Sequence, residues 1–210
     1  MGACVNKAGL KTNDMLPCKG ADWFPVEGIS KSLHALARSQ GVDETAVRRC
    51  IGMQDAICDW LQQQTVTHND AGWHFQEFIR NKELSIGLLD FSKGDSLPVH
   101  DHPGSTGLLL VLDGELIIEN FSIECDDPKS RIVNVKRSNE LSLKPGEFSV
   151  FTPNQGNIHT LVSTSKSCWV LDILISPYAE ADRTWFMPLA TDECKDDFFK
   201  AMTFKKSAKI

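Results

Sequence analysis

Hydrophobic residues follow two different periods along this chain, and the change falls near residue 73. Over residues 43–63, apolar side chains recur at spacings of three and four, which predicts an amphipathic helix that faces the core. A shorter helix is predicted over residues 30–39. Residues 1–28 carry Gly, Pro and Lys without a clear period and are predicted to be a loosely ordered leader.

Beyond residue 73, short apolar runs alternate with turn signals, a pattern typical of β-strands. Asp113-Gly114 stands between two apolar runs and predicts a hairpin, and Lys144-Pro145-Gly146-Glu147 predicts a second turn. The predicted strands cover residues 73–79, 84–91, 107–112, 115–123, 131–136, 148–152, 158–163 and 168–175. Many short strands in roughly a hundred residues indicate a mainly β fold, a double-sheet barrel or jelly roll.

The chain of 210 residues fits one domain with short appendages. We assign residues 29–188 to a single domain that contains the barrel and the N-terminal helical segment. Pro177 is predicted to end the barrel. Residues 189–210 are predicted to be a C-terminal tail that packs outside the barrel, and the protein is expected to be a monomer.

Composition refines this picture mainly by exclusion. A content of 41% hydrophobic and 24% charged residues excludes a disordered or fibrous chain. The net charge of −6 argues against a nucleic-acid partner, because neutralising phosphates requires a basic surface. No apolar run approaches the roughly 18 residues of a membrane span, so no transmembrane segment is expected.

The seven cysteines are irregularly spaced and include no CxxC pair, which argues against a disulfide scaffold and a zinc finger. We expect reduced cysteines in a cytoplasmic protein, with a nuclear location as an alternative. Gly2 and Cys4 would suit a pair of lipid anchors, but Asn6 stands where the myristoylation pattern requires Ser or Thr. A free N-terminus is therefore expected, and lipidation at Gly2 and Cys4 is the alternative.

Three of the six histidines form a candidate metal site. His100 and His102 make an H-x-H pair, and on a strand such a pair points to one face. His159 begins another predicted strand. The alternative interpretation is three separate histidines on the surface or in local hydrogen bonds.

The surroundings of these histidines favour the metal site. Two motifs resemble the metal-binding motifs of cupins: Gly94-(x5)-His100-x-His102 and Gly156-(x2)-His159. The resemblance covers about residues 84–176 and implies a cupin-type double-stranded β-helix, the jelly-roll barrel that the strand pattern also predicts.

The sequence departs from many cupins at one position. A glutamate ligand often stands five residues after the second histidine, and here that residue is Gly107. Three neutral imidazoles leave a divalent ion its full charge and about three open positions. Such a site favours an anionic substrate ligand, and a thiolate is a good candidate because metal binding deprotonates a thiol.

Longer motifs carry a more specific resemblance. His100-Asp101-His102-Pro103-Gly104, Gly156-Asn157-Ile158-His159 and Leu171-Asp172-Ile173-Leu174-Ile175-Ser176-Pro177-Tyr178 occur in this order. Together they resemble the plant cysteine oxidase and cysteamine (2-aminoethanethiol) dioxygenase family, over about residues 30–188. The resemblance implies an Fe(2+) enzyme that adds both atoms of O2 to a thiol and gives a sulfinate. Its substrates are cysteamine or the N-terminal cysteine of proteins and peptides. That second substrate would connect O2 supply to protein degradation.

The resemblance also implies roles for individual residues. His100, His102 and His159 would be the iron ligands. Asp172, a carboxylate within an apolar run, would orient the site or receive the substrate ammonium; a structural hydrogen-bond acceptor is the alternative. Tyr178, the only tyrosine of the chain, would line the entrance or hydrogen-bond the bound oxygen or substrate, and corner packing is its alternative.

One feature of animal members of that family is not expected here. Some of them carry a cysteine–tyrosine pair that can cross-link, whereas Trp185-Phe186 stand in this region of the chain. No cross-link is therefore predicted. The competing functional hypothesis is a zinc- or manganese-binding cupin that acts as an isomerase or hydrolase, or a ligand-binding module without catalysis.

Overall fold

A computed structural model of the chain describes residues 72–80, 84–124, 130–175, 182–189 and 198–206. The predicted leader, the N-terminal helical segment, Gly2, Cys4 and Tyr178 lie outside the described residues. Within the described part of the chain, no helix has the length and hydropathy needed to cross a membrane.

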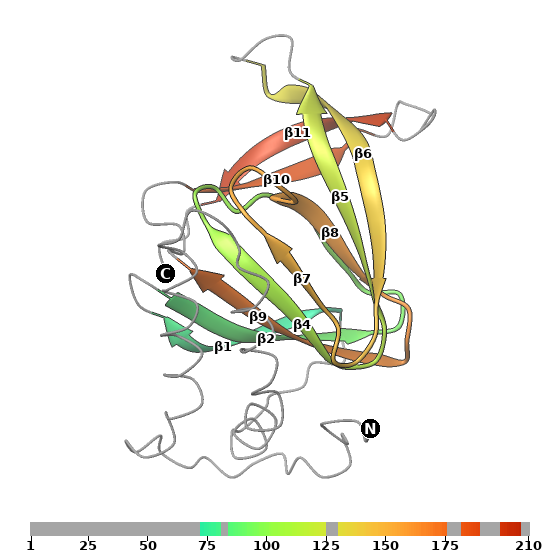
Figure 1. Cartoon of the computed structure of the whole chain (residues 1–210). Helices are drawn as coiled ribbons and strands as arrows, with labels where there is room; N and C mark the ends of the chain where they lie inside the picture. Colours follow the sequence, from blue (N-terminus) through green and yellow to red (C-terminus); the bar gives the residue numbers. More distant parts are fainter. Residues whose placement is uncertain (1–71, 81–83, 125–129, 176–181, 190–197, 207–210) are drawn as a thin grey trace.

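Eleven β-strands make up the described fold. Their bounds are β1 (His74–Arg80), β2 (Leu84–Ser92), β3 (Ser96–His100), β4 (Thr106–Asp113), β5 (Leu116–Glu124), β6 (Ile132–Leu143), β7 (Phe148–Phe151), β8 (Ile158–Ser163), β9 (Ser167–Ile175), β10 (Arg183–Pro188) and β11 (Phe198–Lys206). One sheet has the order β1-β2-β9-β4-β7, and a second set closes on itself in the order β10-β11-β6-β5-β8-β3. Figure 1 shows β9, β2 and β4 on one side of the molecule and β5, β6 and β8 on the other.

The pairing of these strands winds one long antiparallel ribbon into a barrel. Strands β2, β3, β4 and β5 pair in turn with β9, β8, β7 and β6. Successive strands along each half of the ribbon belong alternately to the two sheets. This arrangement is a double-stranded β-helix, so the predicted mainly β, cupin-type jelly-roll fold is confirmed.

The barrel interior is an apolar core that both sheets supply. Leu89 of β2, Leu109 of β4, Leu116 of β5 and Val170 of β9 pack in one buried cluster. β9 is buried along almost its whole length, which agrees with its uninterrupted apolar run. Leu116 and Ile118 of β5 alternate with more exposed residues, as expected for a strand with one buried face.

Three strands were not predicted, and one is much longer than predicted. β3 contains Pro98 within a turn-rich segment, a composition that weakens the strand pattern. β6 continues to Leu143 through a run of polar residues that has no apolar alternation. This run is held in the sheet by its antiparallel pairing with β5. An ion pair of 3.0 Å between Arg137 of β6 and Glu119 of β5 also joins the two strands.

The prediction for the C-terminal tail needs correction. Residues 198–206 form β11, which pairs with both β6 and β10 and belongs to the closed set of strands. Strand β10 also lies beyond Pro177, where the barrel was expected to end. Besides pairing with each other, β10 pairs with β3 and β11 pairs with β6, and these two partners are far away in sequence, so a local pattern does not identify them.

Candidate metal centre

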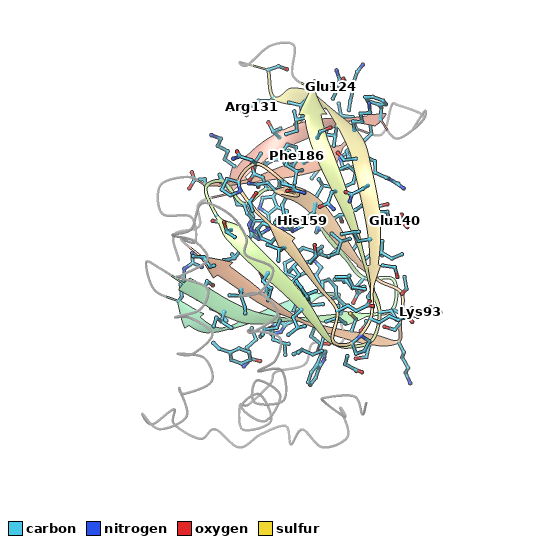
Figure 2. The ribbon with its side chains drawn as sticks, in the orientation of Figure 1. Lys93, Glu124, Arg131, Glu140, His159 and Phe186 are labelled. Atoms are coloured by element: carbon cyan, nitrogen blue, oxygen red, sulfur yellow. The ribbon has the colours of Figure 1, made fainter. Side chains whose placement is uncertain are left out.

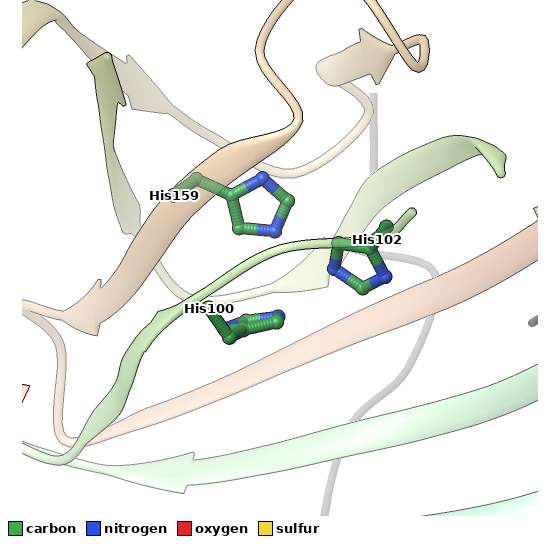
Figure 3. Close-up of side chains that lie close together, drawn as sticks. All are labelled: His100, His102 and His159. Carbon is green, nitrogen blue, oxygen red and sulfur yellow. The ribbon is translucent and has the colours of Figure 1, made fainter. Parts of the chain in front are cut away.

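The register of β3 against β8 places two histidines directly opposite each other. His100 ends β3 and its Cα pairs with that of His159 on β8. Cross-strand partners of this kind have Cβ atoms about 5 Å apart, so the sheet itself brings the two imidazoles together. His102 completes the cluster from the loop that follows β3, and Figure 3 shows the three rings converging.

The three histidines form a compact and buried group of metal-ligating type. One ligand atom of each side chain lies within 4.8 Å of those of the other two. His100 is 1% exposed, and His102 and His159 are each 2% exposed. Figure 2 shows His159 among the interior side chains, whereas Lys93 and Glu140 lie at the periphery.

Two of the rings have a defined orientation and tautomer. His100 Nδ1 lies 2.8 Å from the carbonyl oxygen of Pro98, and His159 Nδ1 lies 3.0 Å from that of Gly156. A carbonyl oxygen only accepts hydrogen bonds, so each Nδ1 donates and carries the proton. The lone pair is then on Nε2, which is the arrangement that metal-binding histidines use.

His102 is held through its backbone rather than by the pleat of a strand. Asn157 Oδ1 accepts a hydrogen bond from His102 N at 2.6 Å, and Asn157 Nδ2 donates to His102 O at 3.1 Å. The same amide donates to Pro153 O at 3.2 Å. A strand would place both imidazoles of the H-x-H pair on one face, but β3 ends at His100, and the amide of Asn157 positions the second histidine.

Burial keeps all three imidazoles neutral. It lowers the pKa of His159 to about 4, and it lowers the pKa values of His100 and His102 well below the ordinary value. The nearby charge of Arg183 acts in the same direction. Neutral imidazoles are the form that binds metal, so these three residues fit a divalent ion.

Asp172 lies on β9, on the same inward face as Val170 and Leu174. It is 8% exposed, and its Oδ1 makes no hydrogen bond among the described residues. Burial raises the pKa of this carboxyl to about 6, while the charge of Arg183 opposes the shift. A buried carboxylate with an unused oxygen is suited to receive a cationic group from a ligand.

A cavity of about 370 Å³ connects these groups. Its polar lining comes from the three histidines together with Glu77, Arg80, Ser85, Asp172 and Arg183. Its apolar lining comes from Trp73, Phe75, Leu89, Leu97, Leu109, Leu161, Leu174 and Trp185. A largely apolar cavity with a few convergent polar groups is the usual form of a small-molecule site.

Sequence reasoning missed two lining residues on β10. The Trp185 ring lies 5.0 Å from that of His100, and the Arg183 guanidinium lies 5.5 Å from the Trp185 ring. They reach the cavity because Trp185 is paired with His100 across β10 and β3. The short Arg-Thr-Trp-Phe run was a signal for a strand, but nothing local linked it to the histidines.

Comparisons with known proteins show which sequences this chain resembles. The PCO_ADO family model matches residues 49–208. The chain is 29% identical to a probable 2-aminoethanethiol dioxygenase of Dictyostelium discoideum over 112 residues, 50% of this chain and 49% of that protein. It is 25% identical to plant cysteine oxidase 1 of Arabidopsis thaliana over 122 residues, 55% of this chain and 41% of that one.

A 2-aminoethanethiol dioxygenase of Mus musculus is 25% identical over 207 residues, 86% of this chain and 73% of that protein. The chain spans about half the length of the first two relatives. A solved protein with a double-stranded β-helix domain from Klebsiella pneumoniae is 14% identical, with a TM-score of 0.42. The alignment covers 55% of this chain and 81% of that one, and it concerns the fold alone.

The family match covers more than half of the chain. It includes the described barrel strands from β1 to β11 and all three clustered histidines. The chain therefore belongs to the PCO_ADO family.

Proposed function

We propose that this protein is a non-haem iron(II) thiol dioxygenase, which converts a thiol and O2 into a sulfinic acid. The observation that carries the proposal is the buried cluster of three neutral histidines, without a carboxylate among them, at the wall of a cavity. Membership of the PCO_ADO family supports it, and so do the names of the relatives.

His100, His102 and His159 would hold the iron through their Nε2 atoms. Iron(II), when bound, would supply the redox chemistry that joins O2 to a thiolate. The protein contributes the orientation of the imidazoles through Pro98 and Gly156 carbonyls. The apolar part of the cavity lining would limit the amount of water around the reacting thiol.

We assign the substrate class as aminothiols, either cysteamine or the N-terminal cysteine of a peptide or protein. The three relatives described above are named for 2-aminoethanethiol or for cysteine. In both compounds an ammonium group lies two carbons from the sulfur. Asp172, with an unused carboxylate oxygen in the cavity, would bind that ammonium and so fix the thiol beside the histidines.

We assign Tyr178 a role at the cavity entrance, where it would contact the substrate. The protein would act as a monomer in the cytoplasm, a compartment in which Fe(2+) and free thiols stay reduced. If peptides are substrates, oxidation of an N-terminal cysteine would make their lifetime depend on O2. The molar mass of the purified protein, measured by light scattering, tests whether it is a monomer. The location of a tagged chain in cells tests whether it is cytoplasmic.

The central test is mass spectrometry of thiols treated with the Fe(2+)-loaded protein under ¹⁸O2. Cysteamine and a Cys-initiated peptide are offered separately and then in competition. Two labelled oxygens on the product are expected, and none from His100→Ala. Absence of labelled sulfinate from both substrates would overturn the proposal, and tightly held zinc in the purified protein would favour the cupin isomerase or hydrolase instead.

A further inference from the structure

The wall of the metal centre on the β4 side is built by a glycine and a phenylalanine. Gly107 of β4 is paired across the sheet with Phe151 of β7. Leu109 and Val111 follow at spacings of two and lie in the interior cluster, as Phe151 does. A side chain at position 107 would therefore project into the barrel.

No side chain fits at that position, because the Phe151 ring already occupies the space. A Cβ added to Gly107 would have its three nearest atoms in the Phe151 ring, the farthest of them only 2.6 Å away. Real Cβ atoms essentially never make contacts shorter than 3.0 Å. The glycine is thus needed for the close approach of the ring.

The same ring packs on two of the three histidines. The Phe151 ring centroid lies 4.6 Å from that of His102 and 5.0 Å from that of His159. Phe151 is only 2% exposed. The phenyl group therefore lies between the β4 backbone at Gly107 and the histidine cluster.

The cavity opens on another side of the cluster. The described residues that line it include the three histidines, Asp172 and Trp185, and Phe151 is not among them. The cavity thus meets the histidines on the side of Asp172 and Trp185, whereas the space beside Gly107 is filled by the Phe151 ring.

We propose that Phe151, admitted by Gly107, is a positioning residue of the metal centre that blocks the side from which a β4 residue could add a fourth ligand. Its ring fixes the rotation of His102 and His159 and keeps water away from that side. Any further ligand of a metal held by the three histidines would then have to come from the cavity. This inference rests on the metal binding in the proposed function.

The test is a titration of metal-free protein with Co(2+), whose visible absorption reports the number and geometry of its ligands. Phe151→Ala and Phe151→Leu are compared with Phe91→Ala, which removes a fully buried phenyl from the same core without a histidine contact. Affinity is expected to fall by about tenfold or more in the Phe151 variants, with an altered absorption spectrum. In Phe91→Ala both properties should stay at the wild-type value, although its thermal midpoint also falls.

A second pair of variants tests the blocked position itself. Gly107→Glu alone is expected to unfold at a lower temperature than wild type, because the ring and the new side chain overlap. Gly107→Glu combined with Phe151→Ala should bind Co(2+) more tightly than Phe151→Ala and shift its absorption, because a carboxylate then joins the histidines. Circular dichroism and the thermal midpoint of each variant show whether it is folded.

The outcomes separate this inference from the proposed function. If wild type binds no Co(2+), both are overturned. If wild type binds it and both Phe151 variants keep the wild-type affinity and spectrum, only the role of Phe151 is overturned. If the double variant binds Co(2+) no more tightly than Phe151→Ala, the claim that the Phe151 ring blocks a fourth ligand at position 107 is overturned.

Discussion

Asn157 holds both backbone groups of His102, a residue 55 positions earlier in the chain. Its amide oxygen accepts from the His102 N–H, and its amide nitrogen donates to the His102 carbonyl. This pair of hydrogen bonds joins the loop after β3 to the segment before β8. The two histidine motifs are therefore a single structural unit, although they are separate in the sequence.

Asn157→Ala should weaken metal binding more than it weakens the fold. Loss of the amide leaves two backbone groups of His102 without these partners, at a cost of about 1–3 kcal/mol. The metal affinity is expected to fall by about tenfold or more, because His102 is no longer held in place. Isothermal titration with Fe(2+) or Co(2+) measures it, and Asn139→Ala, at an exposed asparagine of β6, should leave the affinity unchanged.

Asp172→Asn should stabilise the metal-free protein at neutral pH while it impairs turnover. The folded-state pKa of about 6 is above the unfolded value, so the wild type loses stability as pH rises from about 4 to 6. The variant avoids this loss, and the gain should approach about 3 kcal/mol above pH 6 and vanish near pH 4. Urea unfolding of both proteins at pH 4 and at pH 8 measures this difference in the free energy of unfolding.

The same variant should raise the KM for cysteamine more than it lowers kcat, because it lacks the charge that we propose binds the ammonium. Asp90→Asn is the matched control. That buried aspartate accepts the Trp169 indole N–H at 2.9 Å, so its replacement should not stabilise the protein. Equal stability of wild type and Asp172→Asn at pH 8 would contradict the burial argument.

Arg183→Gln should move the pH dependence of activity to higher pH. The positive charge of Arg183 lowers the pKa of Asp172, so its removal raises that pKa further above about 6. The acid limb of the kcat/KM profile is expected to shift upward accordingly. Arg137→Gln, at an ion pair on β5 and β6 outside the cavity, is the control and should leave the profile in place.

Removal of metal should lower both activity and thermal stability. A ligand that binds only the folded state stabilises it, by about 2.7 kcal/mol when present at a hundred times its Kd. Treatment with a chelator is expected to abolish turnover and to lower the midpoint temperature of thermal unfolding, and Fe(2+) should restore both. Restoration of turnover by Zn(2+) alone would argue against a dioxygenase.

Gly114→Ala should be much more destabilising than Gly94→Ala. Both glycines have positive φ, so either alanine costs about 1–2 kcal/mol in backbone strain. A Cβ at Gly114 also lies 2.8 Å from Cys168 Cα and closer still to Ser167 O, whereas nothing lies within 4 Å of one at Gly94. The free energies of unfolding of the two variants, measured by denaturant titration, should therefore differ by about 1–3 kcal/mol.

Local signals in the sequence were sufficient for most barrel strands and for the identity of the clustered histidines. Alternating or continuous apolar runs identify strands such as β5 and β9, because burial of one face or two faces sets the period. The Asp113-Gly114 turn follows from the positive φ that Gly114 adopts. Such properties depend on neighbouring residues, so a linear pattern carries them.

The tertiary structure decided what lies around the histidines. β10 and β11 become strands through partners distant in the chain, which is how Trp185 and Arg183 reach the cavity. The hydrogen bonds between the Asn157 amide and the His102 backbone likewise depend on the winding of the ribbon. The contact between the Phe151 ring and Gly107 depends on the sheet register, which determines which residues meet. The sequence alone determined which residues are available to bind a metal, and the long-range strand pairing decided their orientation and which side of them is open.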